Sequence, residues 1–179
     1  MRYSRRLRSV APTMAAAVLG NVFVRQDDLK WFKALQSPRM QIPLPASFVV
    51  GGLYYLSIGT VLHRSTIRDD SATYRRGLVV LAGNEIWNYL FFGRRSTRGG
   101  FLGVLGFAVP VCVLQVALVN DRRSALAFAP YTAWVIGYDI PWTYQLWRLN
   151  PVTVTVPLIR SKQPPRPVTQ YGMRQRPRD

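Results

Sequence analysis

The sequence predicts an all-α integral membrane protein, a multi-pass bundle of five transmembrane helices. Three observations predict this fold class. Hydrophobic residues make up 49% of the 179 positions, and they gather in five apolar runs. Of the acidic residues, only Glu85 and Asp139 lie inside a run. The basic residues cluster beside the runs, where membrane helices meet lipid headgroups.

The charge and the scarce metal-binding residues exclude several classes of function. A formal charge of +16 would suggest nucleic acid as the partner of a soluble protein. Here the basic residues flank apolar runs, so membrane lipids are the expected partners and nucleic acid is not. His63 and Cys112 are the only residues of their types and have no other ligand type nearby. No metal site is therefore expected, and no intrachain disulfide can form.

The runs define one transmembrane domain, residues 10–150. A basic segment, 1–9, precedes it, and a disordered, basic tail rich in Pro and Arg follows it at 151–179. Basic residues before an apolar run also fit a signal peptide, but Pro12 and the lack of a clear cleavage site favour a first membrane helix. The predicted helices span residues 10–24, 46–63, 77–93, 99–120 and 124–148.

A long first loop, residues 25–45, separates the first two helices. It contains the aromatic pair Trp31-Phe32, and Pro38, Pro43 and Pro45 follow the pair. Because proline interrupts helical hydrogen bonding, no regular helix is expected in this loop. The aromatic pair either lies at the headgroup level, which is the default, or folds over the bundle as a lid.

Small residues mark packing faces on the second and fourth helices. In the second run, Gly52 and Gly59 share a face with Tyr55, which predicts close approach of a neighbouring helix. In the fourth run, Gly99 and Gly103 form a G-x-x-x-G pattern. This pattern favours packing inside the same chain, and a homodimer contact is the alternative.

The third helix carries the polar residues around which the other four are expected to pack. Asn84, Trp87 and Phe91 share one helical face, with Glu85 and Asn88 beside it. An ionisable residue at membrane depth costs about 2.5–3.5 kcal/mol, so it normally faces the bundle interior. We expect Glu85 to be neutral and hydrogen-bonded to an amide such as that of Asn88, since no basic residue falls inside a run.

The fifth helix carries an aromatic stripe. Tyr131, Trp134, Tyr138 and Trp142 follow one another at helical spacing. Asp139 lies between the last two, and Pro141 predicts a kink next to it. These rings either line a pocket or serve as ordinary bundle packing.

Four motifs, in order, resemble the translocator protein or tryptophan-rich sensory protein family, also called TspO/MBR or the peripheral benzodiazepine receptor family. The resemblance covers about residues 10–150. The chain departs from the family where Glu85 stands in place of a frequent Trp, and it is one residue longer between Trp134 and Trp147. The matching motifs are Trp31-Phe32 with Leu35 and Pro43, Tyr54-Tyr55 with Gly59, Asn84 with Trp87 and Phe91-Phe92, and Pro130-Tyr131 with Trp134, Trp147 and Asn150.

The resemblance implies a pocket that opens toward the first loop and binds porphyrin, haem or sterol-like molecules for transport or sensing. No catalytic residue and no required cofactor are expected. Glu85 and Asp139 are the candidate buried ionisable groups. The expected ligand-binding residues are Trp31, Asn84, Trp87, Phe91, Trp134 and Tyr138.

Two alternatives stay open at this point. The first is an enzyme that degrades porphyrins through pocket tryptophans, with Glu85 and Asp139 as an acid/base couple. The second is a structural or regulatory membrane protein that acts through its basic tail.

Overall fold

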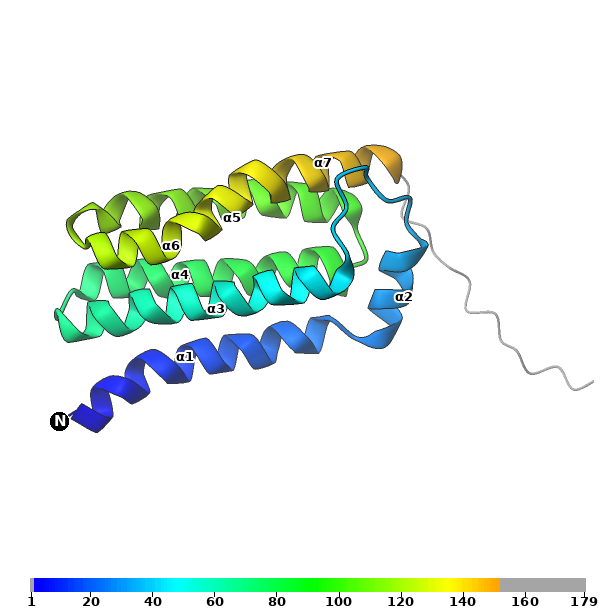
Figure 1. Cartoon of the computed structure of the whole chain (residues 1–179). Helices are drawn as coiled ribbons and strands as arrows, with labels where there is room; N and C mark the ends of the chain where they lie inside the picture. The colour runs from blue at the N-terminus through cyan, green and yellow to red at the C-terminus, as the bar shows by residue number, and fades with distance from the viewer. Residues whose placement is uncertain (1, 152–179) are drawn as a thin grey trace, which may run out of the picture.

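The fold is a bundle of five long helical rods with a short helix across one end (Figure 1). The computed structural model describes residues 2–151, so the predicted tail lies outside the described residues except for Pro151. The N-terminus and the α3–α4 and α5–α6 turns lie at one end, which we call the turn end; α2 and the end of α7 lie at the other. The α-helices are α1 (Arg2–Phe23), α2 (Gln26–Ala34), α3 (Leu44–Ile67), α4 (Ser71–Asn88), α5 (Thr97–Ala117), α6 (Arg122–Trp134) and α7 (Ile140–Leu149).

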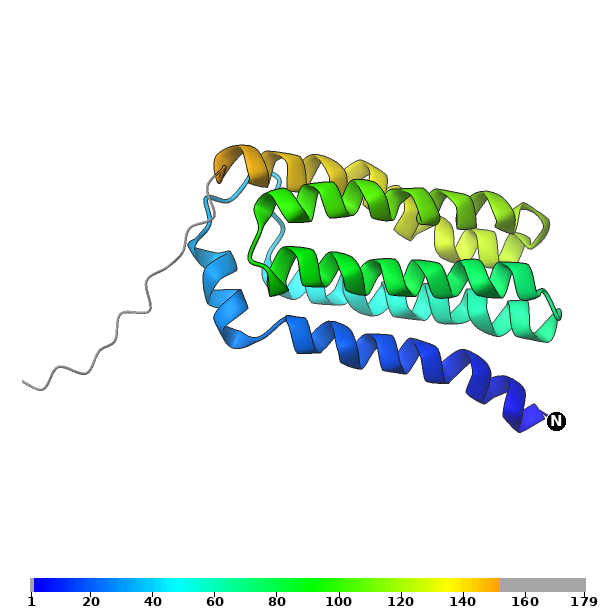
Figure 2. The ribbon, with the colours of Figure 1, turned by 180° about the vertical axis from the view of Figure 1, so that it is seen from behind.

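Three of these rods contain a change of helical pitch. α4 runs into a π-helical segment, Tyr89–Gly93, and α5 ends in a 3₁₀ turn, Leu118–Asn120. A second π-helical segment, Val135–Asp139, joins α6 to α7. Around the bundle the order is α1, α3, α6 with α7, α5 and α4, and α4 also packs against α3 and α1 (Figure 2).

The helix in the first loop corrects the expectation that this loop has no regular helix. α2 ends at Ala34, before the first proline of the loop, Pro38, so the prolines do not interfere with it. Asp27 and Asp28 occupy its first turn, where negative charge is favourable. The Asp28 carboxylate accepts a hydrogen bond from the Arg25 backbone N–H (3.2 Å), which fixes the start of the helix.

Most helices begin earlier than their apolar runs predicted. α4 starts at Ser71, not at residue 77, because the Asp70 side chain caps it by accepting a hydrogen bond from the Thr73 N–H (2.9 Å). α1 likewise extends back to Arg2, since arginine is a good helix former. An apolar run marks only the part of a helix that suits lipid, whereas capping residues determine where the helix begins.

Two helices of the described chain, Leu44–Ile67 and Thr97–Asn120, are long and apolar enough to cross a membrane by length and composition. Many apolar side chains on the outside of the bundle are exposed, among them Leu56, Val109 and Val116. The interior is apolar as well: Ile58, Val61 and Phe128 are fully buried. Apolar residues on both faces are expected when the surrounding solvent is hydrocarbon.

The contact between α4 and α5 depends on glycine. A Cβ on Gly100 would lie 2.5 Å from the Phe91 ring, and one on Gly99 would lie 2.9 Å from the Leu90 carbonyl oxygen. A Cβ on Gly103 would lie 3.2 Å from both Leu90 and Trp87. The G-x-x-x-G pattern therefore packs inside the chain, as the sequence favoured. We call this contact the α4/α5 seam.

Candidate functional site

The largest cavity in the described part of the chain is an interior space of about 410 Å³ between α1, α3, α4 and the α6–α7 rod. Its lining combines apolar and aromatic side chains with a few polar groups, as is typical of small-molecule sites. The lining residues that carry the argument below are Phe32, Gln41, Gly51, Gly52, Tyr55, Asn84, Trp87, Asn88, Tyr131, Trp134, Tyr138, Asp139 and Trp142.

One wall of the cavity is a ladder of stacked rings on the α6–α7 rod. The ring centroids of Trp134 and Tyr138 are 4.2 Å apart, and those of Tyr138 and Trp142 are 6.1 Å apart with an interplanar angle of 10°. The π-helical segment Val135–Asp139 lies within this ladder. A π-helical turn accommodates one additional residue, which is compatible with the extra residue expected between Trp134 and Trp147.

The π-helical segment also explains how Pro141 fits. Proline has no N–H for the helical ladder and normally kinks a helix. Here the helix widens immediately before Pro141, and the Ile140 N–H bonds to the Val135 carbonyl, five residues back. The irregularity expected at this position is present as a π-helical turn.

The first loop closes the cavity as a lid, which is the second of the two arrangements considered for Trp31-Phe32. We define the lid as α2 and the following residues 35–43. The Tyr138 hydroxyl donates to the Met40 carbonyl (3.0 Å) and accepts from the Ile42 N–H (3.1 Å). The Trp142 indole N–H donates to Gln41 Oε1 (2.8 Å). The rings that wall the cavity therefore also hold its lid.

A second set of contacts anchors the start and the middle of the lid. At its start, Asp28 forms an ion pair with Arg95 (3.0 Å). Just after α2, the Asn150 amide accepts from the Gln36 N–H (2.9 Å) and donates to the Gln36 carbonyl (3.0 Å). The lid is thus bonded to the α4–α5 connection and to the end of α7.

The polar wall of the cavity is centred on Glu85. Glu85 Oε1 accepts from the Tyr55 hydroxyl (2.9 Å) and from Asn84 Nδ2 (3.1 Å), and Oε2 lies 3.4 Å from Asn88 Nδ2. A Cβ on Gly20 would lie 2.7 Å from Oε2, so α1 approaches the carboxylate closely. Glu85 faces the bundle interior and has amide partners, as the sequence predicted.

The predicted ligand-binding residues fall into two groups. Asn84, Trp87, Trp134 and Tyr138 line the cavity. Trp31 and Phe91 do not; they are 3% and 0% exposed and pack edge to face, with centroids 5.6 Å apart, in a cluster beneath the lid. The Trp31 indole N–H has no acceptor there.

Of the two candidate buried ionisable groups, Asp139 lines the cavity, and Glu85 contacts three residues that line it. Several other lining residues were not predicted as site residues. Trp142 continues the aromatic stripe by one more step, so the spacing could have identified it. Gln41 could not have been found, because its contact depends on how the lid folds. Phe32, Tyr55 and Asn88 are further examples.

The α3 glycines were predicted to let a neighbouring helix approach closely, and the structure shows this for only one of them. Gly51 and Gly52 line the cavity, and a Cβ on either would meet nothing within 4 Å. Only Gly59 contacts another helix, at 3.6 Å from Thr13 of α1. The small residues at the start of α3 therefore leave space, and they do not bring two helices together.

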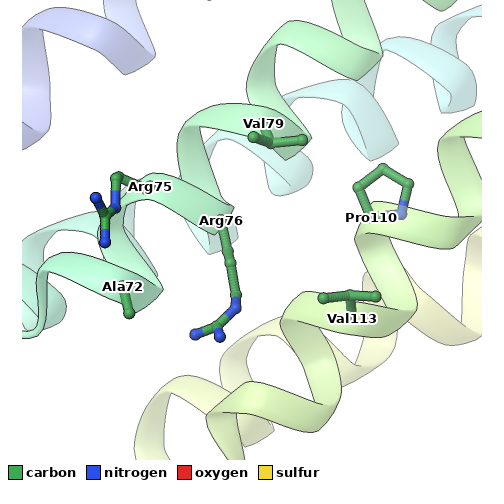
Figure 3. Close-up of a pocket in the computed structure, with 6 residues that line it drawn as sticks. All are labelled: Ala72, Arg75, Arg76, Val79, Pro110 and Val113. Carbon is green, nitrogen blue, oxygen red and sulfur yellow. The ribbon is translucent and has the colours of Figure 1, made fainter.

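A second hollow, of about 270 Å³, lies outside the bundle between α4 and α5 (Figure 3). It is formed by the apolar residues Ala72, Val79, Pro110 and Val113 with two arginines, of which Arg76 extends across the gap. This groove contains none of the predicted site residues and no aromatic ring. The interior cavity is therefore the stronger candidate site.

A sequence model of the TspO/MBR family matches residues 9–148, which is most of the chain. The chain belongs to the TspO/MBR family. Members of this family are membrane proteins, so the bundle is an integral membrane domain and its exposed apolar side chains face lipid. The family match also covers the lid, the cavity walls and the α4/α5 seam.

Two relatives of this TspO/MBR chain show how far the similarity extends. The translocator protein of Ovis aries is 25% identical over 142 residues, covering 74% of this chain and 82% of that protein. The protein CrtK of Rhodobacter capsulatus is 36% identical over 76 residues, covering 41% of this chain. That second match spans 46% of CrtK, somewhat less than half of its length.

Proposed function

We propose that this TspO/MBR protein binds a flat, largely apolar molecule of the tetrapyrrole or sterol-like class in the interior cavity, for transport or sensing. The observation that supports this most is the ladder of Trp134, Tyr138 and Trp142, whose rings wall the cavity in a stacked series. A planar ligand can stack against such a wall, and each aromatic pair contributes about 0.5–1.5 kcal/mol beyond the area it buries.

The lid supplies the proposed function with a route by which a ligand enters the interior cavity. The ring ladder holds the lid by hydrogen bonds through Tyr138 and Trp142. A ligand that stacks on the ladder would therefore lie directly beneath the lid, and closure would remove it from lipid and water. Such closure suits a carrier or a sensor, because both must retain a ligand without altering it.

The test is a spectral titration of the full chain, purified in non-ionic detergent, with protoporphyrin IX and with haem. We expect saturable binding that Trp134→Leu weakens about five- to tenfold. Trp147→Leu is the matched control, because Trp147 stacks on Phe101 at 5.5 Å and does not line the cavity. If neither porphyrin binds, or if both variants bind equally well, the proposed site is wrong.

The porphyrin-degrading alternative is tested in the same titration. The described residues contain no group of three or more His, Cys, Asp or Glu side chains that could hold a metal ion. Under illumination, a binding protein should leave the porphyrin absorbance constant. Loss of that absorbance with formation of a product in the wild type, but not in Trp134→Leu, would assign catalysis to the cavity.

A further inference from the structure

Apart from tyrosines, the ionisable side chains found at the interior cavity among the described residues are acids. Among the described lining residues, Asp139 is the only ionisable acid or base apart from tyrosines, and no Lys, Arg or His is present. A second acid, Glu85, lies one hydrogen bond behind the lining. The ion pairs found in the described chain, Lys30–Asp27, Arg64–Asp121, Arg68–Asp121 and Arg95–Asp28, involve neither of these two acids.

Glu85 also determines which polar atoms face the cavity. Its oxygens take hydrogen bonds from the amide nitrogens of Asn84 and Asn88 and from the Tyr55 hydroxyl. The N–H groups that bond to Glu85 are not available to a carboxylate ligand, and the side-chain carbonyl oxygens of Asn84 and Asn88 can accept from a ligand that donates. The polar wall therefore suits a ligand that donates hydrogen bonds.

The wall formed by the α6–α7 rod also favours a ligand with a positively charged or hydrogen-bond-donating group. Asp139 follows Tyr138 in the ring ladder and lines the cavity. The rings of Tyr131, Trp134 and Trp142 line the same cavity. Aromatic faces attract cations through their quadrupole, so the rings and the two acids favour the same charge.

We propose that this cavity selects ligands whose polar end is a cation, such as a protonated amine, over ligands whose polar end is a carboxylate. This selectivity rests on the proposed function, since it concerns the same cavity. A carboxylate would face two acids and, among the described lining residues, no base. A protonated amine beside Asp139 would favour the ionised form of both carboxyls, including that of Glu85, which is expected to be neutral in the empty cavity.

The experiment uses three porphyrins with one ring system: protoporphyrin IX with its two carboxylates, its neutral dimethyl ester, and a diamide with two protonated amines. Each is titrated into the full chain in non-ionic detergent at neutral pH. We expect the diamine to bind most tightly and the diacid least, with about a tenfold difference between them.

Two variants locate the selectivity. Asp139→Asn and Glu85→Gln should each weaken binding of the diamine about fivefold and leave the affinity of the ester unchanged. The ester titration also reports whether the cavity is intact in each variant. Asp70→Asn is the matched control, because Asp70 lies at the turn end, does not line the cavity, and caps α4 in a way that asparagine can reproduce. It should change none of the three affinities.

The outcomes separate the two proposals. If the diacid binds the wild type as tightly as the diamine, the selectivity is overturned while the proposed function stands. If none of the three porphyrins binds, the proposed function itself is overturned. Should Asp139→Asn fail to fold, the order of the three affinities in the wild type still decides the matter. A diamine affinity that neither variant lowers would also overturn the role of the two acids.

Discussion

Helices α3 and α5 both carry clustered glycines, yet the two clusters serve opposite purposes. On α5, Gly99 and Gly100 lie so close to the α4 rod that a single added carbon would collide with it. On α3, Gly51 and Gly52 border the cavity and touch nothing within 4 Å. One cluster removes space between helices, and the other provides it.

The difference teaches that a glycine pattern indicates only where side chains are missing. Whether a neighbouring helix or a ligand fills the resulting space depends on the next helix. Against α5, the Phe91 ring fills it, and the Trp87 indole donates to the Gly100 carbonyl (3.0 Å) across the seam. Against the start of α3, no helix does, because the lid and the ring ladder hold the surrounding walls apart.

The variant with the largest expected effect on stability disrupts the α4/α5 seam. In Gly100→Leu the new side chain meets Phe91, which is fully buried and packed against Trp31 and Trp142 and therefore cannot turn away. We expect the free energy of unfolding to fall by about 3 kcal/mol, the upper range for overpacking. Thermal unfolding in detergent, followed by circular dichroism, measures the loss.

The control for this variant lies on the same helix. Gly106 has nothing within 4 Å of a Cβ, so Gly106→Leu should keep stability or raise it by up to about 1 kcal/mol, since leucine is the better helix former. Equal unfolding midpoints for the Gly100 and Gly106 variants would mean that α4 and α5 do not depend on close approach.

The turn end of the bundle gives a second effect, which depends on charge and not on packing. Asp121 lies outside the membrane helices and accepts hydrogen bonds from Arg64 (2.6 Å) and from Ser124 (2.7 Å). We expect Asp121→Asn to lower the free energy of unfolding by about 1–2 kcal/mol at neutral pH. An unchanged midpoint would mean that the Arg64–Asp121 contact does not stabilise the fold.

The same contact predicts a pH dependence. The hydrogen bond from Arg64 lowers the pKa of Asp121 below its ordinary value of 3.8. A carboxyl whose pKa is lower in the folded state stabilises that state above the unfolded value, and the stabilisation is lost as the pH falls below it. The midpoints of the wild type and Asp121→Asn should therefore differ at neutral pH and converge below pH 3.8. Parallel curves across this range would contradict the assignment.

A substitution in the glycine cluster of α3 should have the smallest effect on stability. It should nevertheless have a clear effect on ligand binding. In Gly52→Leu the side chain should enter the cavity and lower porphyrin affinity at least about tenfold. Stability should hold or rise, because leucine is a better helix former than glycine by up to about 1 kcal/mol. If binding survives and stability falls, then α3 packs through Gly52 and the comparison between the two helices fails.

The bundle was predictable from sequence because each apolar run is long and its polar residues are few. The aromatic stripe was predictable too, since Trp134, Tyr138 and Trp142 recur at helical spacing. The inward position of Glu85 followed from its cost in lipid. In each case one local pattern along a single helix carries the information.

The lid was not predictable from local patterns. Its long-range hydrogen bonds join residues 67 to 114 positions apart in sequence, from Asp28–Arg95 to Gln36–Asn150. The same limit applies to Trp31, which was expected at the pocket and instead packs on Phe91. Sequence spacing places an aromatic ring on a helix face, but only the packing of distant segments decides what the ring meets.

The paired hydrogen bonds between Asn150 and Gln36 have a consequence for rates. The Asn150 carbonyl also accepts from the Thr97 hydroxyl (2.8 Å), so this residue ties the lid and the start of α5 to the end of α7. If a ligand enters beneath the lid, as the proposed function implies, opening must first break this latch. We therefore expect the latch to slow both association and dissociation and to lengthen the residence time.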